Sequence, residues 1–284
     1  TPGYAQSRMR WEPLVEVTQI KGYSETHADL SPTDEFADFG TYEHLIAAEG
    51  AESELIFTDA FLSELSDSDR IYVQGNPERI GRAGDYARSG LLRGLAVEDR
   101  IGLNPYKFGL IGSTDSHSGL ASADENNFHG KMALDSTPEN KAKEIVPGTT
   151  GWDMSAAGLV AVWAEENTRA SLFDAMQRKE AYATTGPRIS LRFFGGWNFS
   201  DTDLNEGDAA KAGYKKGVPM GGEFHRTAVE NAPRYLIMAM KDHTGANLDP
   251  NQLVKRWIDE TGATQEQVFD IVWYDDLKHN AKGK

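Results

Sequence analysis

The sequence predicts an α/β fold in which residues 1–195 form an α/β layer or barrel and residues 196–284 form a small antiparallel β-rich unit. Short apolar, strand-like segments alternate with amphipathic helical segments in the first part, whereas strand-like segments dominate after Arg188. The chain has 284 residues, of which 39% are hydrophobic. It is therefore long enough to bury a sizeable core in one large domain or in two unequal ones.

The first hundred residues contain one predicted strand and two predicted helices. Residues 14–20 are rich in β-branched side chains and stop before Gly22, which predicts a strand. Apolar spacing predicts helices over residues 42–55 and 85–100. Three leucines share one face of the second helix: Leu91, Leu92 and Leu95.

The middle of the chain continues this alternation. The apolar run at residues 108–111 predicts a buried strand that leads into a polar, glycine-bounded loop. Residues 121–150 lack a clear period and predict a long loop, which in a compact domain is usually functional or mobile. A further strand is predicted over residues 158–163, followed by a helix that Asn167 or Thr168 caps.

The last third of the chain has a different sequence pattern, in which strand-like segments dominate. Four strands are predicted there, at residues 189–194, 235–240, 252–258 and 268–274. Residues 259–267 are the segment of this part with some helical character. The change of pattern places the domain boundary between residues 195 and 196.

Charge and composition exclude several functional classes. The formal net charge is -15, and because no basic patch interrupts it, neither a nucleic acid nor an anionic membrane is expected as a partner. No apolar run reaches the length of about 18 residues that a spanning helix needs. Residues 25–69 hold thirteen acidic and no basic residues, which predicts either a solvated surface or a cation-attracting flank of a metal site. The chain has no Cys, so any metal would be held by His, Asp or Glu, and both a cytoplasmic and a periplasmic or secreted location stay open.

The most informative motif is Asp115-x-His117, which follows the predicted strand at residues 108–111. In an extended segment, residues i and i+2 point to the same side, so the carboxylate and the imidazole would converge on one cation beyond the strand end. Barrels of the α/β class hold their active sites at this end of their strands. The alternative is a turn rich in Ser and Asp, in which a side chain caps the next segment.

Three other residues lie in similar surroundings. Glu25 and His27 follow the first predicted strand, and they would therefore reach the same end of a parallel sheet as Asp115. His129 lies in a polar segment that ends at Lys131. For each imidazole, the alternative is a surface histidine that is exposed or hydrogen-bonded.

Residues 184–188 (T-T-G-P-R) combine hydroxyl groups with a guanidinium group. Thr185 and Arg188 could bind an anionic group of a substrate, with Arg188 in bidentate geometry. The alternative is a helix-to-strand turn with an arginine on the surface. The sequence contains no phosphate-binding loop, dinucleotide fingerprint or nucleophile elbow, which argues against kinases, dinucleotide oxidoreductases and serine hydrolases.

Four segments, taken in order, resemble the C-terminal portion of a bacterial family, the domain-of-unknown-function 3604 family of the PHP (polymerase and histidinol phosphatase) superfamily. They are L-V-E-V-T-Q-I-K-G-Y-S-E-T-H (14–27), N-P-Y-K-F-G-L-I-G-S-T-D-S-H-S-G (104–119), E-N-N-F-H-G-K (125–131) and A-E-E-N-T-R-A-S-L-F-D-A-M-Q-R-K-E-A-Y-A-T-T-G-P-R-I (164–189). The resemblance covers most of the chain, from near Leu14 into the β-rich tail.

The resemblance implies a distorted (β/α) barrel whose strand ends hold two or three divalent metal ions, such as zinc, manganese or iron. It also implies a metal-dependent hydrolase of a small-molecule phosphoester, ester or amide. Asp115 and His117 match the D-x-H metal motif of the family, and Glu25 and His27 are carried over as strand-end metal ligands. The H-x-H motif that opens the family's barrel is missing, because no two of the seven His are two residues apart. Together with the opening at Thr1, this predicts a truncated chain.

In this hydrolase, His129 or Lys131 would protonate the leaving group or bind an anion, and Arg188 and Thr185 would bind the substrate. The D-x-H motif by itself supplies two metal ligands, Asp115 and His117, whereas catalytic sites usually take three or more. We therefore expect weak metal binding and slow turnover from this chain alone. Strand edges exposed by truncation would favour a homo-oligomer. The alternative functions are a non-catalytic module that binds a ligand or partner chain, and a structural remnant of proteolysis.

Overall fold

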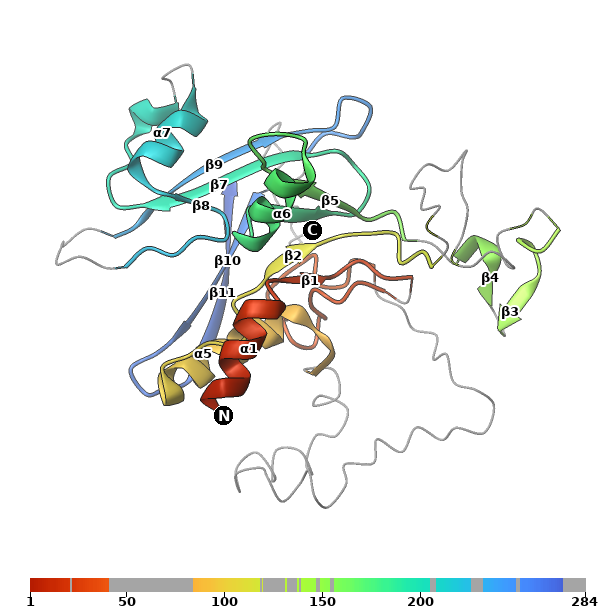
Figure 1. Ribbon diagram of the computed structural model, residues 1–284, viewed down its shortest axis with the longest axis horizontal. Helices are drawn as coiled ribbons and strands as arrows, with labels where there is room; N and C mark the ends of the chain where they lie inside the picture. Colours follow the sequence, from red (N-terminus) through yellow and green to blue (C-terminus); the bar gives the residue numbers. More distant parts are fainter. Residues whose placement is uncertain are drawn as a thin grey trace, which may run out of the picture.

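The computed structural model describes residues 1–20, 22–40, 84–117, 119, 131, 137, 139–146, 149–153, 156–204, 208–225, 232–248 and 251–272. Within these ranges, short helices and small sheets are mixed along the chain (Figure 1). The helix predicted over residues 42–55 and most of the loop predicted over residues 121–150 lie outside the described residues.

One layer of strands carries the candidate site. Its strands are β1 (Leu14–Glu16), β2 (Gly109–Ile111), β5 (Leu159–Val162) and β6 (Ala181–Thr184). β1 pairs with β2 in parallel, β6 packs beside β2, and β5 pairs with β6 in antiparallel orientation. β6 runs in the same direction as β2, because Gly109 lies against Lys179 before β6, and Gly112 lies against Thr184 at its end. The carboxyl ends of β1, β2 and β6 therefore lie on one side of the layer.

The predicted helices in this part of the chain are confirmed where the structure describes them. Three helices precede or flank the strands: α1 (Pro2–Trp11), α5 (Ala87–Ile101) and α6 (Arg169–Gln177). α5 ends at Gly102, whose left-handed conformation (φ 70°) lets its amide donate to Glu98 O. α6 begins as predicted, because Thr168 Oγ1 accepts a hydrogen bond from Ser171 N over 3.3 Å.

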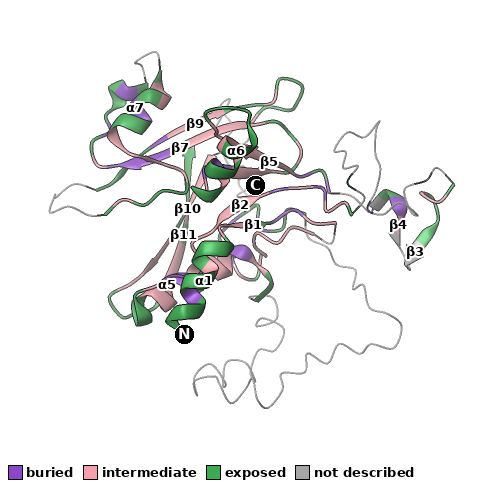
Figure 2. Ribbon diagram, in the orientation of Figure 1, coloured by how far each residue is buried: buried purple, intermediate pink, exposed green. Residues whose placement is uncertain are grey.

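A three-stranded antiparallel sheet follows this layer. Its strands are β7 (Ser190–Gly196), β8 (Val218–Pro219) and β9 (Arg234–Met240), in the order β8-β7-β9. The core of this sheet contains Phe194, Phe199 and Leu236, of which Phe194 is 1% exposed. α7 (Ala209–Lys216) packs against β7. Figure 2 shows both exposed and buried residues on α6 and α7; the buried ones are Ala175 in α6 and Ala212 and Gly213 in α7.

A long hairpin ends the described chain, formed by β10 (Asn251–Ile258) and β11 (Thr264–Val272). The helical character of residues 259–267 does not lead to a helix, because these residues form a turn and the start of β11. Asp259 Oδ1 accepts hydrogen bonds from the amides of Thr261 and Ala263, which closes a tight turn and brings Thr264 into register with Ile258. The hairpin packs against α5.

Several observed elements were not predicted: α1, β6, α7, the two-residue β8 and the short β3 (Glu144–Val146), β4 (Thr149–Thr150), η2 (Gly151–Asp153) and η3 (Asp201–Leu204). α1 is a polar segment with little apolar spacing, and the others are at most two turns or four residues long. Elements of this kind owe their conformation to neighbouring segments rather than to their own periodicity.

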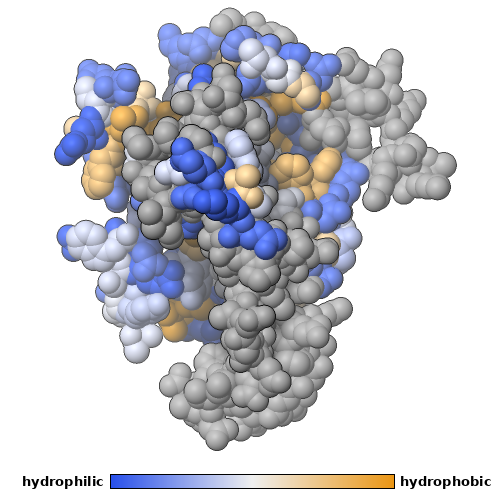
Figure 3. All heavy atoms as spheres, turned by 90° about the vertical axis from the view of Figure 1, so that its right-hand side faces the viewer, coloured by the Kyte–Doolittle hydropathy of each residue, from blue (hydrophilic) through white to orange (hydrophobic). Residues whose placement is uncertain are grey.

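The α/β class is confirmed, whereas the partial barrel is not: the described strands form small sheets and no closed barrel. The predicted domain boundary after residue 195 falls inside β7. No helix in the described part of the chain is long and apolar enough to cross a membrane. On the face shown in Figure 3, the apolar described residues lie in separate groups among hydrophilic ones.

Candidate functional site

The candidate site lies just beyond the ends of β1 and β2. Thr18 lies two residues after β1. Its hydroxyl Oγ1 donates a hydrogen bond to Ser113 O and accepts one from Ser113 N, each over 2.6 Å. Thr18 is buried. This reciprocal pair extends the contact between the two chain segments past their last paired residues, and it holds the start of the loop that carries the D-x-H motif.

Two glycines bring the neighbouring strands close to this loop. A Cβ atom at Gly112 would lie 2.7 Å from Leu159 O and 2.9 Å from Thr184 O. One at Gly158 would lie 2.2 Å from Thr18 Oγ1. Because any side chain would force these backbone segments apart, glycine is required at both positions.

The structure brings Asp115, His117 and Lys131 together in the loop. Lys131 Nζ donates to Asp115 Oδ2 over 2.8 Å, and His117 Nε2 lies 3.5 Å from Asp115 Oδ1. The amide of His117 donates to Lys131 O over 2.7 Å, which joins the two loop segments. The side chains of Asp115 and Lys131 are 15% and 10% exposed, whereas that of His117 is 55% exposed. Each carboxylate oxygen therefore faces a different basic group, and the imidazole is open to solvent.

Asp115 and His117 converge for a reason other than the predicted one. β2 ends at Ile111, and Asp115 adopts a left-handed backbone conformation with φ 54°, so these residues do not form an extended segment. Asp tolerates this region better than most residues, and side chains held in it often belong to functional sites. The turn of the loop, held by Lys131, points the two side chains toward each other.

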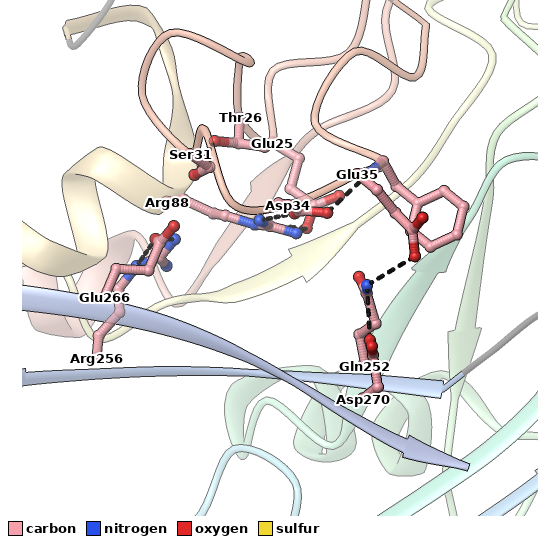
Figure 4. Close-up of polar contacts among 11 residues, drawn as sticks. Glu25, Thr26, Ser31, Asp34, Glu35, Arg88, Gln252, Arg256, Glu266 and Asp270 are labelled. Carbon is pink, nitrogen blue, oxygen red and sulfur yellow. Dashed lines mark hydrogen bonds and ion pairs between the residues drawn. The ribbon is translucent and has the colours of Figure 1, made fainter. Parts of the chain in front are cut away.

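Glu25 lies in a second cluster, whose centre is Arg88 of α5 (Figure 4). Arg88 Nε and Nη2 donate to Glu25 Oε1 over 2.8 and 2.6 Å, and Nη1 donates to Asp34 Oδ2 over 2.5 Å. The Asp34 side chain is 1% exposed. Burial disfavours the charge on Arg88, but the carboxylates of Glu25 and Asp34 outweigh this effect and raise the pKa of the guanidinium. The three side chains join the loop after β1 to α5.

The β10–β11 hairpin adds a neighbouring ion pair. Arg256 Nε donates to Glu266 Oε2 over 2.6 Å, and Figure 4 shows this pair beside Arg88. Burial lowers the pKa of Arg256, and the positive charge of Arg88 acts in the same direction. Two arginines thus lie close together, each balanced by its own carboxylates.

A cavity of about 290 Å³ opens between the ends of β1 and β6, the loop after β1, and β10. Its lining includes the hydroxyl residues Thr18, Thr26, Thr184 and Thr185, the aromatic residues Tyr23, Phe36 and Phe39, and Gln252. The rings of Tyr23 and Phe39 stack with their centroids 5.6 Å apart. Burial raises the pKa of Tyr23, so its hydroxyl keeps its proton at neutral pH. The volume is close to that of the smallest usual ligand pockets.

The predicted ligands do not gather into one metal site. His27 Nδ1 accepts a hydrogen bond from Asp29 N over 3.1 Å, and its ring packs against Tyr86. The described residues include no group of three or more His, Asp or Glu that could hold a metal ion. Glu25 and His27 are therefore not brought into one ligand set with the D-x-H motif.

The remaining predicted residues have separate positions. Thr185 is among the residues that line the cavity, and its role in substrate binding stays a prediction. Arg188 is exposed and lies outside that lining, and its amide donates to Asp242 Oδ2 over 2.8 Å. His129 lies outside the described residues.

The sequence did not single out Arg88 and Asp34. In the sequence, Arg88 is an ordinary basic residue near the start of a predicted helix. Asp34 is one of the thirteen acidic residues of the segment 25–69, which contains no Lys or Arg. That run does imply a cation from elsewhere in the chain for any carboxylate that becomes buried. It does not say which of the chain's 29 basic residues supplies it.

The fold and this geometry define a mixed α/β protein with a polar site and a small cavity at the carboxyl ends of parallel strands. The chain belongs to the family described as "Protein of unknown function (DUF3604)", which matches residues 1–284. No curated protein and no solved structure gives a significant match to this chain.

Proposed function

We propose that this chain is a metal-dependent hydrolase of the PHP type, in which Asp115 and His117 hold part of a divalent-cation site. The supporting observation is the separation of 3.5 Å between His117 Nε2 and Asp115 Oδ1. This separation exceeds the usual hydrogen-bond range of about 2.7–3.2 Å. Two ligand atoms, each about 2.0–2.2 Å from one tetrahedral cation, would lie roughly 3.4 Å apart. The spacing of the two atoms thus fits a shared cation better than a direct hydrogen bond.

The donor types fit as well. A carboxylate oxygen and an imidazole nitrogen are ligands that zinc, manganese and iron accept. A cation bound there would polarise the scissile group of a phosphoester, ester or amide and lower the pKa of a bound water toward about 7. Catalytic sites normally take at least three protein ligands, so the proposal requires a further ligand that is not among the described residues.

The residues around the motif would prepare the site. Lys131 holds Asp115 Oδ2, which leaves Oδ1 turned toward His117. The exposed imidazole leaves the site accessible to a small substrate. His129 stays the candidate proton donor. The distorted PHP barrel is part of the same proposal, and the common direction of β1, β2 and β6 supports it.

Metal binding and turnover test this proposal together. Mn²⁺ and Zn²⁺ are titrated by calorimetry into the wild type, the double variant Asp115→Asn/His117→Gln and the control His225→Gln. His225 is a fair control because it is exposed and forms no ion pair with a carboxylate among the described residues. We expect the double variant to lose at least about tenfold in metal affinity, and to lose hydrolysis of a panel of phosphate, carboxylate and carbamate esters. Equal affinity or equal turnover in wild type and double variant would overturn the proposal.

A non-catalytic binding module is the second candidate. The observation that favours it is the pairing of the charged residues that line the cavity. Arg88 neutralises the carboxylates of both Glu25 and Asp34. A cavity with stacked aromatic walls, whose described lining residues include no unpaired carboxylate, is better suited to holding a ligand than to proton transfer. Ligand binding that is unchanged in the Asp115→Asn/His117→Gln variant, with no turnover in either protein, would favour the module.

A further inference from the structure

A second cavity lies at the opposite end of the β5–β6 pair from the D-x-H motif. At the motif end, Leu159 is paired with Thr184; at the other end, Trp163 N donates to Glu180 O over 2.9 Å. The second cavity opens beside this latter pair and has a volume of about 610 Å³. It is bounded by α6, β7, α7 and β8, which contribute Arg178, Arg192, Tyr214 and Pro219.

The guanidinium of Arg192 lies over an indole ring in this cavity. Its Cζ atom lies 3.5 Å from the centroid of the Trp163 ring. Trp163 Nε1 donates to Leu191 O over 2.8 Å, which fixes the plane of the indole. Stacking of this kind satisfies the face of the guanidinium and leaves the N–H donors at its edge available.

Arg192 has no carboxylate partner among the described residues. Its one hydrogen bond there runs from Nη1 to the hydroxyl of Tyr214 over 3.2 Å. A guanidinium carries five N–H donors, so most of those of Arg192 face the cavity or solvent unpaired. Partly buried arginines are normally paired with an acid, which makes this arrangement unusual.

The buried carboxylate of the cavity is already engaged by other groups. The Glu180 side chain is 5% exposed; its Oε1 accepts from the Tyr214 hydroxyl and its Oε2 from Arg178 Nη2 over 3.2 Å. Burial raises the pKa of Tyr214, and its contact with Glu180 acts in the same direction, so the hydroxyl stays protonated at neutral pH. Arg178 balances Glu180, whereas Arg192 forms no ion pair among the described residues; the second carboxylate of the cavity lining belongs to Glu165, which is exposed.

We propose that this cavity binds a small molecule that carries a carboxylate or phosphate group on a flat apolar body. Arg192 would bind the anionic group in bidentate geometry, with Arg178, half-exposed at the rim, as a second donor. Trp163, Tyr214 and Pro219 would contact the apolar body. The volume lies within the range of small-molecule sites. The cavity is separate from the strand-end site, so this binding does not depend on hydrolase activity.

Four probes test the proposal by calorimetry at low salt: benzoate, phenyl phosphate, acetate and inorganic phosphate. We expect saturable binding of benzoate, phenyl phosphate or both to the wild type, with the two ring-free anions weaker. The preferred probe of the ring pair identifies the anionic group. Arg192→Gln should weaken binding by at least about tenfold, whereas Arg169→Gln should leave it unchanged, because Arg169 is exposed on α6 and does not line the cavity. No saturable binding of any probe up to about 10 mM, or equal binding by Arg192→Gln, would overturn the proposal.

A second pair of variants guards against misfolding, because Arg192 packs on Trp163. Arg192→Lys keeps the charge and the stem but loses the planar fork, and should bind the preferred probe several-fold more weakly than wild type. Arg178→Gln changes a half-exposed side chain and should weaken binding of the preferred probe by a smaller factor than Arg192→Gln does. The circular dichroism melting curve of each variant shows that it is folded. Folded variants that both bind as tightly as the wild type would contradict the proposed role of the two guanidinium groups.

Discussion

Lys131 Nζ donates a hydrogen bond to Asp115 Oδ2 over 2.8 Å, and both side chains are largely buried. The ammonium neutralises a carboxylate of the loop that follows β2, and it ties together loop segments 16 residues apart. It also occupies one of the two oxygens that a cation could use. Lys131 therefore supports the loop, and it would compete for Asp115 with a metal ion bound as we propose.

Replacing Lys131 should have opposite effects on stability and on metal binding. Lys131→Met leaves the Asp115 carboxylate unpaired, which should lower the free energy of unfolding by about 3 kcal/mol, the lower end of the cost for a buried ion pair. Removing the competing ammonium should strengthen Mn²⁺ binding at Asp115 and His117. Urea unfolding and calorimetric titration measure the two effects. Lys211→Met, on the exposed side of α7, serves as the control, and an unchanged stability of Lys131→Met would contradict the ion pair.

Arg88 should be among the most sensitive positions in the chain. Arg88→Met removes the partner of Asp34, whose side chain is 1% exposed, and should destabilise the fold by roughly 3–5 kcal/mol. Arg88→Lys keeps the charge but cannot bridge two carboxylates, so its loss should be smaller. Equilibrium unfolding in urea compares both with Arg93→Met, an exposed arginine of the same helix. If Arg88→Met unfolds at the same urea concentration as Arg93→Met, the role of the cluster is refuted.

The reciprocal bond between Thr18 and Ser113 makes a third prediction. Thr18→Val keeps the shape of the side chain but leaves Ser113 N and Ser113 O without their partner, at a cost of about 1–3 kcal/mol. Thr18→Ser retains the hydroxyl and should lose less. Thermal unfolding measures both, and a loss that is equal in the two variants would show that packing rather than hydrogen bonding is responsible.

Asp242 should make stability depend on pH in the acid range. Hydrogen bonds from the amides of Arg188 and Thr244 lower its pKa from 3.8 to about 2. A carboxylate with a depressed folded-state pKa stabilises the fold above its unfolded value and loses this contribution as the pH falls through the folded value. Wild type should therefore be more stable than Asp242→Asn at neutral pH, and the difference should shrink between about pH 4 and pH 2. Urea unfolding at several pH values measures the difference, and a constant gap across that window would contradict the pKa.

Elements with their own periodicity could be predicted from the sequence. The leucine spacing of α5, the Thr cap of α6 and the apolar runs of β5, β7 and β9 each lie within one short segment. Residues 259–267 have some helical character in the sequence, although Asp259 begins a tight turn. Polar residues occur both in tight turns and in exposed helices, so the local sequence does not distinguish the two. Here, pairing with β10 decides the conformation.

The candidate site shows the same division. The D-x-H motif could be found from the sequence, but its side chains converge through a left-handed turn and a lysine from another segment rather than through strand alternation. Nothing in the local sequence assigned Glu25 to Arg88, because their separation of 63 residues leaves the pairing to the packing of α5 against the loop after β1.

The sequence by itself determined the α/β class, the acidic charge and the residue types that the strand ends present, because periodicity and composition are local properties of the chain. Only the tertiary structure decided which carboxylates are neutralised, by Arg88 and Lys131, and that the half-buried guanidinium of Arg192 has no ion-pair partner among the described residues. The physical reason is that the free energy of a charge depends on its burial and on its neighbours within a few ångströms. Those neighbours come from segments that are distant in sequence.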